Sequence, residues 1–506
     1  MQAVSEPPLE RNRRSLFGWV VLAAFLLRLP GLGAWNFWYD EVLTFDESRL
    51  GFGDLLRALH DSESDKPPLY FLTLHGWLPA THAEFWARLP SALWSALASG
   101  FGALLASELL ERRAARIAAL FLVASPFLAW YGHEARPSAL WTMWSAAALW
   151  LVVRFVREGG ARHLVPAALC AALADYTFPY AIFLPAAAVL VALAGEPAVR
   201  TRRTASVAAA MAASLLLYLP WMLRVAGHGA PVVGVAKGAP WDSLGYTVYA
   251  LGYGFTLGPS LGDLQAERKA WLAAHPLGTG TVALALVLLL AFAARGVWTL
   301  RRNRPALAAG LGGMAVFVGI PAAISFLKPS ITFNPRYACP ALFPLALLVG
   351  AGVAAAWKRG GWRRWGVAAF AGFLAWSLAN FFGNPHYAKD DLRGAVRLLS
   401  AEGVRETVVC DGSLGLVVGH YAPGPKPIPF TAKPPEAFAA AAAELKEKLA
   451  GVRRFGVIYA RPDIGDPAHR FPAWLKENYA VVREEALPGV RVFVVENPGP
   501  PAPAGR

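Results

Sequence analysis

The sequence predicts a mainly α-helical protein that crosses a membrane many times and carries a small α/β domain outside it. Three observations predict this class. The 506 residues are 56% hydrophobic and only 16% charged, which is unusual for a soluble protein. Apolar runs long enough to cross a bilayer recur along most of the chain. Beyond Asn384 the pattern changes to short apolar segments with helix and strand spacing.

A helix needs about 20 mostly apolar residues to cross the roughly 30 Å hydrocarbon core of a bilayer. We mark eleven such stretches, with boundaries that can move by several residues. They cover residues 16–33, 88–110, 114–131, 138–156, 163–178, 180–195, 205–226, 277–298, 305–327, 336–356 and 363–382.

Lys and Arg occupy every second loop between these stretches, and such loops stay on the cytoplasmic side of a membrane. This alternation places the N-terminus inside and the C-terminal domain outside. Because the basic residues are divided among short loops, the net charge of +14 indicates topology and does not favour nucleic acid as a partner. The three cysteines are too few and too scattered for a disulfide framework or a cysteine-based metal site.

The predicted organisation is a cytoplasmic N-terminus at 1–15, a membrane domain at 16–383, an outer α/β domain at 384–498 and a disordered tail at 499–506. Two outer loops, at 34–87 and 227–276, are longer than a connection requires, and long loops on a rigid bundle often carry function. The apolar segment 67–78 in the first loop is too short to cross the membrane, so we expect it to lie at the membrane interface or to re-enter the membrane. The outer domain is predicted to contain helices at 389–402 and 436–449 and strands at 407–410, 455–459 and 490–495.

Asp40 and Glu41 directly follow an aromatic segment, 35–39, at the exit of the first stretch. A carboxylate held against aromatic surface at the bilayer boundary is partly desolvated, and a poorly solvated carboxylate is a stronger base. The alternative is that the aromatic residues form an ordinary interfacial belt and that Asp40 caps a following helix. The residues alone leave both interpretations open.

Cationic side chains are also expected at the outer boundary. Lys66 precedes two prolines in the first loop, Arg136 lies in the short loop His133-Glu134-Ala135-Arg136-Pro137, and Arg336 with Tyr337 opens the tenth stretch. A lipid phosphate at this depth could be bound by them. The alternatives are snorkelling of the cations to lipid headgroups and a solvated turn at His133 and Glu134. Asp175, near the outer end of the fifth stretch, is either a helix cap or part of the site.

These segments resemble a known family in order and spacing. They are RLPGLGAWNFWYDEVLTF, DKPPLYFLTLHGW, EFWARLPSALW, SPFLAWYGHEARPSAL and NPRYACPALFPLALL. The resemblance is to bacterial glycosyltransferases of glycosyltransferase family 39, which are related to protein O-mannosyltransferases and aminoarabinose transferases. It covers residues 16–200 well and the tenth stretch fairly well. It implies the GT-C superfold and a sugar donor linked to polyprenyl phosphate.

The resemblance also implies roles for individual residues. Asp40 maps to the acidic residue at the reaction centre, with Glu41 as its electrostatic or metal-coordinating neighbour. Lys66 matches a position that carries His or Lys before Pro-Pro and contacts the lipid phosphate in aminoarabinose transferases. Glu134 and Arg136 match a QEAR-type second loop. His133 replaces the commoner Gln, which leaves open a metal ligand and a second acidic site.

The implied reaction moves a hexose or pentose from the donor to a hydroxyl or phosphate on a protein, lipid A or another glycan. The implied location is the inner membrane of a bacterium, with the site on the periplasmic or extracellular side. A paired carboxylate could also hold a divalent cation. Two other classes compete: a non-catalytic membrane scaffold, and a secondary transporter, which is disfavoured because the sequence shows no internal repeat.

Overall fold

The computed structural model describes residues 8–61, 66–78, 83–227, 240–266, 269–328, 333–422 and 424–497. The chain divides into two compact units. The first contains Met1–Leu32, Phe45–Leu257 and Gly280–Phe382, and the second contains Gly33–Thr44, Gly258–Thr279 and Gly383–Arg506.

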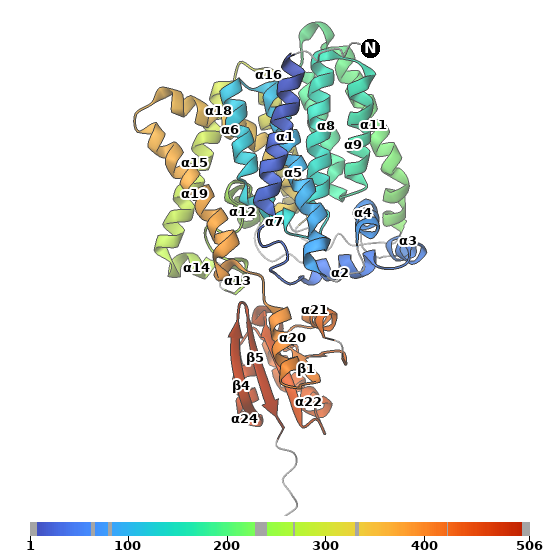
Figure 1. Cartoon of the computed structure of the whole chain (residues 1–506), viewed down its shortest axis with the longest axis vertical. Helices are drawn as coiled ribbons and strands as arrows, with labels where there is room; N and C mark the ends of the chain where they lie inside the picture. The colour runs from blue at the N-terminus through green and yellow to red at the C-terminus, as the bar shows by residue number, and fades with distance from the viewer. Residues whose placement is uncertain are drawn as a thin grey trace, which may run out of the picture. The chain divides into compact units, whose positions relative to one another are not determined.

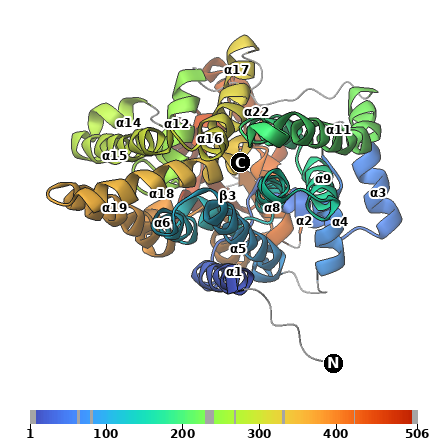
Figure 2. The ribbon, with the colours of Figure 1, turned by 90° about the horizontal axis from the view of Figure 1, so that it is seen from above.

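Long helices of the first unit run side by side, as Figure 1 shows along their length and Figure 2 shows from one end. Their bounds are α1 Pro8–Arg28, α5 Glu84–Leu109, α6 Arg112–Val123, α7 Pro126–Gly132, α8 Ser138–Glu158, α9 Ala161–Asp175, η1 Pro179–Phe183, α10 Leu184–Leu193, α11 Pro197–Gly227, α15 Pro276–Leu300, α16 Arg304–Leu307, π-helices Ala308–Gly312 and Ala315–Gly319, α17 Ile320–Leu327, η4 Pro335–Ala341, α18 Leu342–Arg359 and α19 Arg363–Gly383. Shorter helices connect them: α2 Tyr39–Ser48, α3 Phe52–Asp61, α4 Leu69–Trp77, α12 Pro240–Tyr253, α13 Leu261–Ala266 and α14 Lys269–Ala274.

Every one of the eleven predicted apolar stretches coincides with a helical segment. Among the described residues, seven segments are long and apolar enough to cross a membrane, and α6 with α7, bent by 42°, makes an eighth candidate. The stretches at 16–33, 163–178 and 180–195 form α1, α9 and η1 with α10, which fall short of the same measure in length or composition. The segment at 67–78 forms the nine-residue helix α4, which is too short to cross.

Small residues set the packing between α15 and α18. A Cβ atom added at Gly296 would lie 1.9 Å from the backbone oxygen of Leu348, and one at Gly352 would lie 1.9 Å from that of Phe292. The two helices therefore cross with their backbones in contact, which only glycine permits at these positions. Small residues commonly allow such close crossings inside membranes.

The C-terminal part of the second unit is an α/β domain built on a five-stranded sheet in the order β2-β1-β3-β5-β4. β1 runs parallel to β2 and β3, whereas β5 pairs antiparallel with β3 and β4. Phe455, Val457, Phe493 and Val495 belong to its buried core. Its elements are α20 Leu392–Ala401, β1 Glu406–Val409, α21 Leu414–Tyr421, β2 Ile428–Pro429, η6 Pro435–Ala437, α22 Phe438–Lys448, β3 Arg454–Ala460, α23 Pro462–Gly465, α24 Phe471–Asn478, β4 Ala480–Leu487 and β5 Val490–Glu496, with η5 Pro385–Tyr387 before them.

The predicted fold class is confirmed: a helical membrane protein with a small α/β domain after its last long helix. The three strands and two helices expected from the sequence are present as β1, β3, β5, α20 and α22. The edge strand β4 was not predicted, because most of its residues are exposed or charged and it lacks a buried apolar face. A turn at Pro488 and Gly489, where Gly489 has a φ of +68°, joins β4 to β5.

Candidate active site

Glu41 is fully buried in the first turn of α2, and contacts with Trp38 and Lys389 help to fix it there. Its Oε2 accepts a hydrogen bond from the backbone N–H of Trp38 at 3.4 Å and lies 3.4 Å from Nζ of Lys389. Trp38 directly precedes α2, so Glu41 satisfies one of the unpaired donors at the helix start. The side chain is thus both a cap and one half of a buried ion pair.

Other contacts within the second unit hold the same segment to the α/β domain. Nζ of Lys389 also lies 5.5 Å from the ring centre of Trp38, within the range of a cation–π contact. The hydroxyl of Tyr421 accepts from the backbone N–H of Phe37 at 2.7 Å, and Arg393 donates to the backbone oxygen of Ala34 at 2.6 Å. The aromatic segment at 35–39 therefore has a structural role that is more specific than an interfacial belt.

Asp40 differs from Glu41 in its exposure. The residue is only partly buried, and its backbone oxygen accepts from the hydroxyl of Thr44 at 2.7 Å, inside α2. It follows the N-terminal residue of α2 and does not precede the helix, so it is not the N-cap residue of the alternative interpretation. Of the two acidic residues, Asp40 is the one that a ligand can approach.

In the first unit, the loop after α7 is held by His133 and Glu134, both of which are buried. Nε2 of His133 lies 2.7 Å from the backbone oxygen of Arg28, so that nitrogen carries the proton and donates. Nε1 of Trp130 donates to Oε1 of Glu134 at 3.0 Å. Both side chains therefore anchor the loop, which corrects the expectation of a solvated turn. Arg136, in the same loop, is half-buried.

Arg28 is completely buried at the C-terminal end of α1, and its partners are all neutral oxygens in the part of the chain that the structure describes. The guanidinium donates to the backbone oxygens of Ala24 and Leu122 and to the hydroxyls of Ser95 and Ser99, over distances of 2.6 to 3.3 Å. These contacts join α1, α5 and the end of α6. The backbone oxygen of Arg28 accepts the hydrogen bond from His133, so the residue that joins these helices also holds the loop after α7.

Arg336 and Tyr337 lie in η4, whose start is capped by Asn334. The guanidinium carbon of Arg336 lies 5.4 Å from the ring centre of Tyr337, which stacks on Tyr180 with centres 4.4 Å apart and planes 9° apart. Phe178 extends this aromatic row and stacks on Trp141 at 5.0 Å. Phe178 and Tyr180 could not be singled out from the sequence, because aromatic residues near a membrane boundary are too common to be distinctive.

The second loop and η4 come together around two buried groups. Glu134 and Arg336 both lie within electrostatic range of the Tyr131 hydroxyl and of the Cys339 thiol. The structure thus brings together two predicted site residues, Glu134 and Arg336, that are about two hundred positions apart. Of these two charged residues, Arg336 lies beside the aromatic row, through its contact with Tyr337.

Lys66 forms an ion pair with Glu47 of α2, with Nζ and Oε1 2.5 Å apart and about a quarter of each side chain exposed. The ammonium group of Lys66 therefore has a specific protein partner and does not simply extend to the lipid headgroups, as the snorkelling interpretation requires. Three residues further on, the backbone N–H of Leu69 donates to the oxygen of Tyr176 at 3.0 Å, which ties the start of α4 to the end of α9. This hydrogen bond fixes the start of α4, three residues after Lys66, next to the residue that follows Asp175.

Comparisons with known proteins agree on one architecture. A family model described as dolichyl-phosphate-mannose-protein mannosyltransferase matches residues 65–223, less than half of the chain. Apo ArnT from Cupriavidus metallidurans superposes with a TM-score of 0.56 at 15% identity over 96% of this chain and 98% of its own; ArnT bound to undecaprenyl phosphate gives 0.52 at 16% over 95% and 97%. The chain has the GT-C glycosyltransferase fold.

A second similar solved structure is that of the oligosaccharyltransferase AglB from Archaeoglobus fulgidus, in complex with an inhibitory peptide and a dolichol-phosphate. It has a TM-score of 0.51 at 13% identity and covers 95% of this chain and 74% of its own. No curated protein matches the chain closely in sequence. The implied GT-C fold is confirmed, and the chain is a multi-pass membrane protein. The family model includes Lys66, His133, Glu134 and Arg136 but neither Asp40 nor Arg336.

The fit of a divalent cation can be tested on the described residues. Among them, no group of three His, Cys, Asp or Glu side chains is close enough to hold a metal ion. Nε2 of His133 is engaged with a carbonyl, and Glu41 is engaged with Lys389. The divalent cation therefore stays a proposal, and we assign no chemical step to it.

Asp175 is the last residue of α9 and is completely buried, yet neither carboxylate oxygen has a hydrogen-bond partner among the described residues. The end of α9 is capped by backbone groups, so the helix-cap interpretation does not hold. A buried carboxyl group without partners lowers stability by about 1–3 kcal/mol. Such a group is retained in a fold most readily where it serves a function.

We expect Asp175→Leu to raise the unfolding temperature in detergent, because an apolar side chain of similar size removes the unsatisfied group. Sugar transfer by the same variant should fall if the carboxyl group belongs to the site and stay unchanged if it does not. Asp263→Leu is a control for loss of an acidic residue, since Asp263 already accepts from the backbone N–H of Ser260 and pairs with His386. A less stable Asp175→Leu protein would show that the carboxyl group has a stabilising partner.

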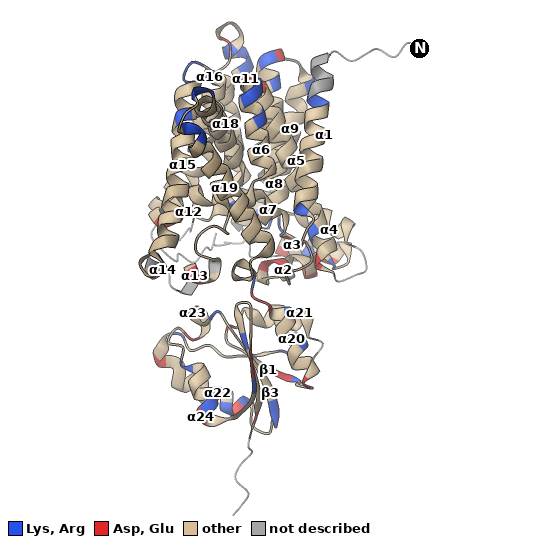
Figure 3. Ribbon diagram, turned by 60° about the vertical axis from the view of Figure 1, so that its left-hand side comes forward, with Lys and Arg blue, Asp and Glu red and all other residues tan. Residues whose placement is uncertain are grey.

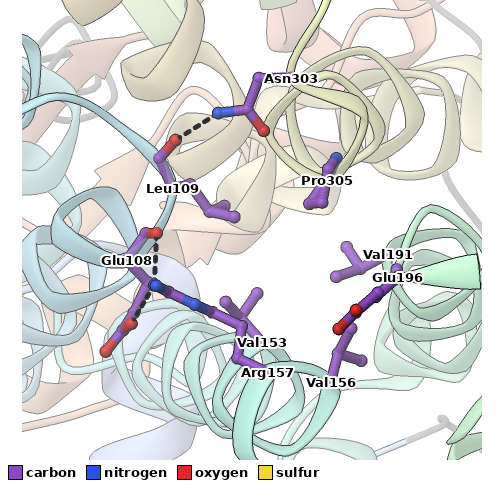
Figure 4. A pocket seen from close by; sticks show the side chains of 10 residues that line it. Glu108, Leu109, Val153, Val156, Arg157, Val191, Glu196, Asn303 and Pro305 are labelled. Atoms are coloured by element: carbon purple, nitrogen blue, oxygen red, sulfur yellow. Dashed lines mark hydrogen bonds and ion pairs between the residues drawn. The ribbon is translucent and has the colours of Figure 1, made fainter. Parts of the chain in front are cut away.

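A separate cavity of about 390 Å³ lies at the basic end of the first unit, where the Lys and Arg positions of the ribbon gather in Figure 3. In Figure 4, Arg157 bridges to Glu108, and Asn303 donates to the backbone oxygen of Leu109. Glu108 also pairs with Arg13 at 3.1 Å and with Arg154 at 3.6 Å. These polar groups bind one another, so the cavity is a structural junction of α1, α5 and α8.

Glu108→Gln should lower the free energy of unfolding by about 1–3 kcal/mol. The full cost of breaking a buried ion pair is about 3–5 kcal/mol, but two of its three arginine partners are partly exposed and screened by water. Thermal unfolding of the purified protein measures the effect, and Glu158→Gln is the control at the next ion pair on α8. Equal unfolding temperatures for wild type and Glu108→Gln would show that the ion pairs of Glu108 do not stabilise this junction.

Proposed function

We propose that the protein is a membrane glycosyltransferase that moves a sugar from a polyprenyl-phosphate donor to an acceptor outside the cytoplasm. The observation that supports this most strongly is the match to ArnT along nearly the whole of both chains, because that protein was solved with undecaprenyl phosphate. AglB, a second match, was solved with a dolichol-phosphate and an inhibitory peptide. The donor sugar is a hexose or pentose, and the acceptor is a protein, lipid A or another glycan.

The proposed chemistry is a single displacement. Asp40 accepts the proton of an acceptor hydroxyl, and the hydroxyl oxygen forms a bond to the anomeric carbon. The bond between that carbon and the phosphate oxygen breaks, and the polyprenyl phosphate leaves with the electron pair. Glu41 positions Asp40 through the start of α2 and through Lys389. A phosphate acceptor would need no proton removed at neutral pH.

The phosphate of the donor is proposed to be bound by Lys66, Arg136 and Arg336, with Tyr337 supporting Arg336. Fixed cations stabilise the charge that develops on the leaving phosphate. Lys66 is suited to binding the phosphate because Glu47 already holds its ammonium group in place. The ammonium group has three donors, so it can bind a Glu47 oxygen and a phosphate oxygen at the same time. The aromatic row beside Arg336 offers a flat surface for the sugar or the first isoprene units.

Lys66→Ala should weaken binding of the donor by roughly tenfold to a hundredfold, because a hydrogen bond to a charged group is worth about 1.5–3 kcal/mol. Lys66→Arg keeps the charge and should bind more tightly than Lys66→Ala. Titration of each purified variant with a fluorescent polyprenyl phosphate measures the affinity. Lys328→Ala is a control, since Lys328 is an exposed lysine that is not among the residues proposed to bind the phosphate. Wild-type affinity in both Lys66 variants would exclude Lys66 from the site.

Incubation of the purified protein with a panel of labelled polyprenyl-phosphate sugars tests the proposed function. A glycosyltransferase releases polyprenyl phosphate and transfers or hydrolyses the sugar. A secondary transporter would move a substrate across proteoliposomes without breaking a bond, and a scaffold would do neither. Release from one donor class would also distinguish a hexosyl- from a pentosyltransferase.

A further inference from the structure

An apolar groove of about 500 Å³ opens on the first unit between α6, α18 and α19. Phe121, Phe370 and Leu374 form its buried floor, whereas Leu120 on its rim is 66% exposed. Apart from the two arginines at one end, its lining is apolar or aromatic. The groove shares no lining residue with the predicted donor site or with the cavity of Figure 4.

The length of the groove matches half of a bilayer. On α6 it extends from Arg113 to Ala124, and on α19 from Val367 to Leu378. Eleven helical steps correspond to about 16 Å at 1.5 Å per residue. The hydrocarbon core of a bilayer is roughly 30 Å thick, so the groove spans one leaflet.

One end of this groove is positively charged. Arg113 and Arg116 line it there, with Trp357 beside them, and the guanidinium of Arg364 lies 5.4 Å from the Trp357 ring centre. No carboxylate among the described residues forms an ion pair with Arg113 or Arg116. Figure 3 places this end with the other basic loops. An anionic headgroup there would supply the missing opposite charge, and Trp357 is a side-chain type that favours the membrane interface.

We propose that the groove binds a glycerophospholipid with an anionic headgroup, from the leaflet at the basic end of the bundle. One acyl chain lies against Phe121, Phe370 and Leu374, and the headgroup phosphate contacts Arg113 and Arg116. The donor lipid is not the occupant, because the second loop with His133 and Glu134 follows α7, at the opposite end of the α6–α7 pair from Arg113. This binding does not depend on the proposed enzymatic activity.

Native mass spectrometry of the delipidated full-length protein tests the proposal. The protein is titrated with phosphatidylglycerol and phosphatidylcholine that carry the same acyl chains. Arg113→Gln with Arg116→Gln should weaken binding of phosphatidylglycerol by about tenfold or more, since each basic side chain near an anionic lipid contributes about a factor of five. Phosphatidylcholine binding should change little. The matched control, Arg202→Gln with Arg302→Gln, removes the same charge from the basic end outside the groove.

A second pair of variants tests the acyl chain separately. Ala371→Phe narrows the groove and should weaken binding of both lipids, whereas Ala369→Phe adds the same bulk to an exposed position of α19 outside the groove. Unchanged phosphatidylglycerol binding in the arginine variant, or equal loss in its control, would overturn the proposal. Displacement of phosphatidylglycerol by equimolar polyprenyl phosphate would also overturn it, because the groove would then belong to the lipid carrier.

Discussion

Sugar transfer is expected to fall by about 100-fold or more in Asp40→Asn, which is the usual scale for loss of a general base. Asparagine keeps the size of the side chain but cannot accept the acceptor proton. Asp40 is only partly buried in the first turn of α2, so folding and donor binding should persist. Initial rates with a labelled donor, together with titration of polyprenyl phosphate, separate a chemical defect from a binding defect.

Glu41→Gln is the matched control for this substitution. It removes the charge that pairs with Lys389 but keeps an oxygen for the Trp38 N–H, so its effect on transfer should be milder. If Glu41→Gln were inactive and Asp40→Asn fully active, Glu41 would be the base and Asp40 its neighbour. Full activity in both variants would contradict the first-loop mechanism.

Arg28→Ala should produce the largest loss of stability, about 2–4 kcal/mol, seen as a fall of several degrees in the unfolding temperature. The substitution leaves a cavity where a completely buried side chain stood and removes four hydrogen bonds, three of which join α1 to α5 and to the end of α6. Transfer by the protein that remains folded should also fall, because the end of α1 loses the contacts that fix it, and its backbone oxygen at position 28 positions His133.

Arg28→Lys tests whether charge or geometry matters at this position. A lysine keeps the positive charge but has a single ammonium group, which cannot reach all four oxygens that the planar guanidinium binds. We therefore expect Arg28→Lys to be nearly as unstable as Arg28→Ala. Wild-type stability in Arg28→Lys would show that the charge alone is required, and wild-type stability in Arg28→Ala would show that the network contributes nothing.

The helices and the outer domain could be predicted from the sequence because their signals are local. An apolar stretch such as 336–356 and a strand such as β3 each depend on a run of neighbouring residues. Contacts between distant segments carry no such signal. The close crossing of α15 and α18 at Gly296 and Gly352 required the structure, as did the exposed edge strand β4.

The candidate site shows the same division. The residue types at Asp40, Lys66 and Arg336 are sufficient by themselves to suggest a base and phosphate-binding cations. The partner of Glu41 could not be predicted, because Lys389 lies almost 350 positions further along the chain and resembles any charged residue at the start of a helix. In the sequence Arg28 is only an interruption of an apolar stretch, whereas in the fold it is a buried connection of three helices.

The most direct test of the proposed function is donor turnover by the purified protein in proteoliposomes. Wild type and Asp40→Asn are each incubated with the polyprenyl-phosphate sugar that the panel identifies, and released polyprenyl phosphate is followed over time. If the protein is a GT-C glycosyltransferase with Asp40 as its base, we expect steady release of polyprenyl phosphate by wild type and a rate at least about 100-fold lower in Asp40→Asn. No release from any donor, or equal rates in the two proteins, would contradict it.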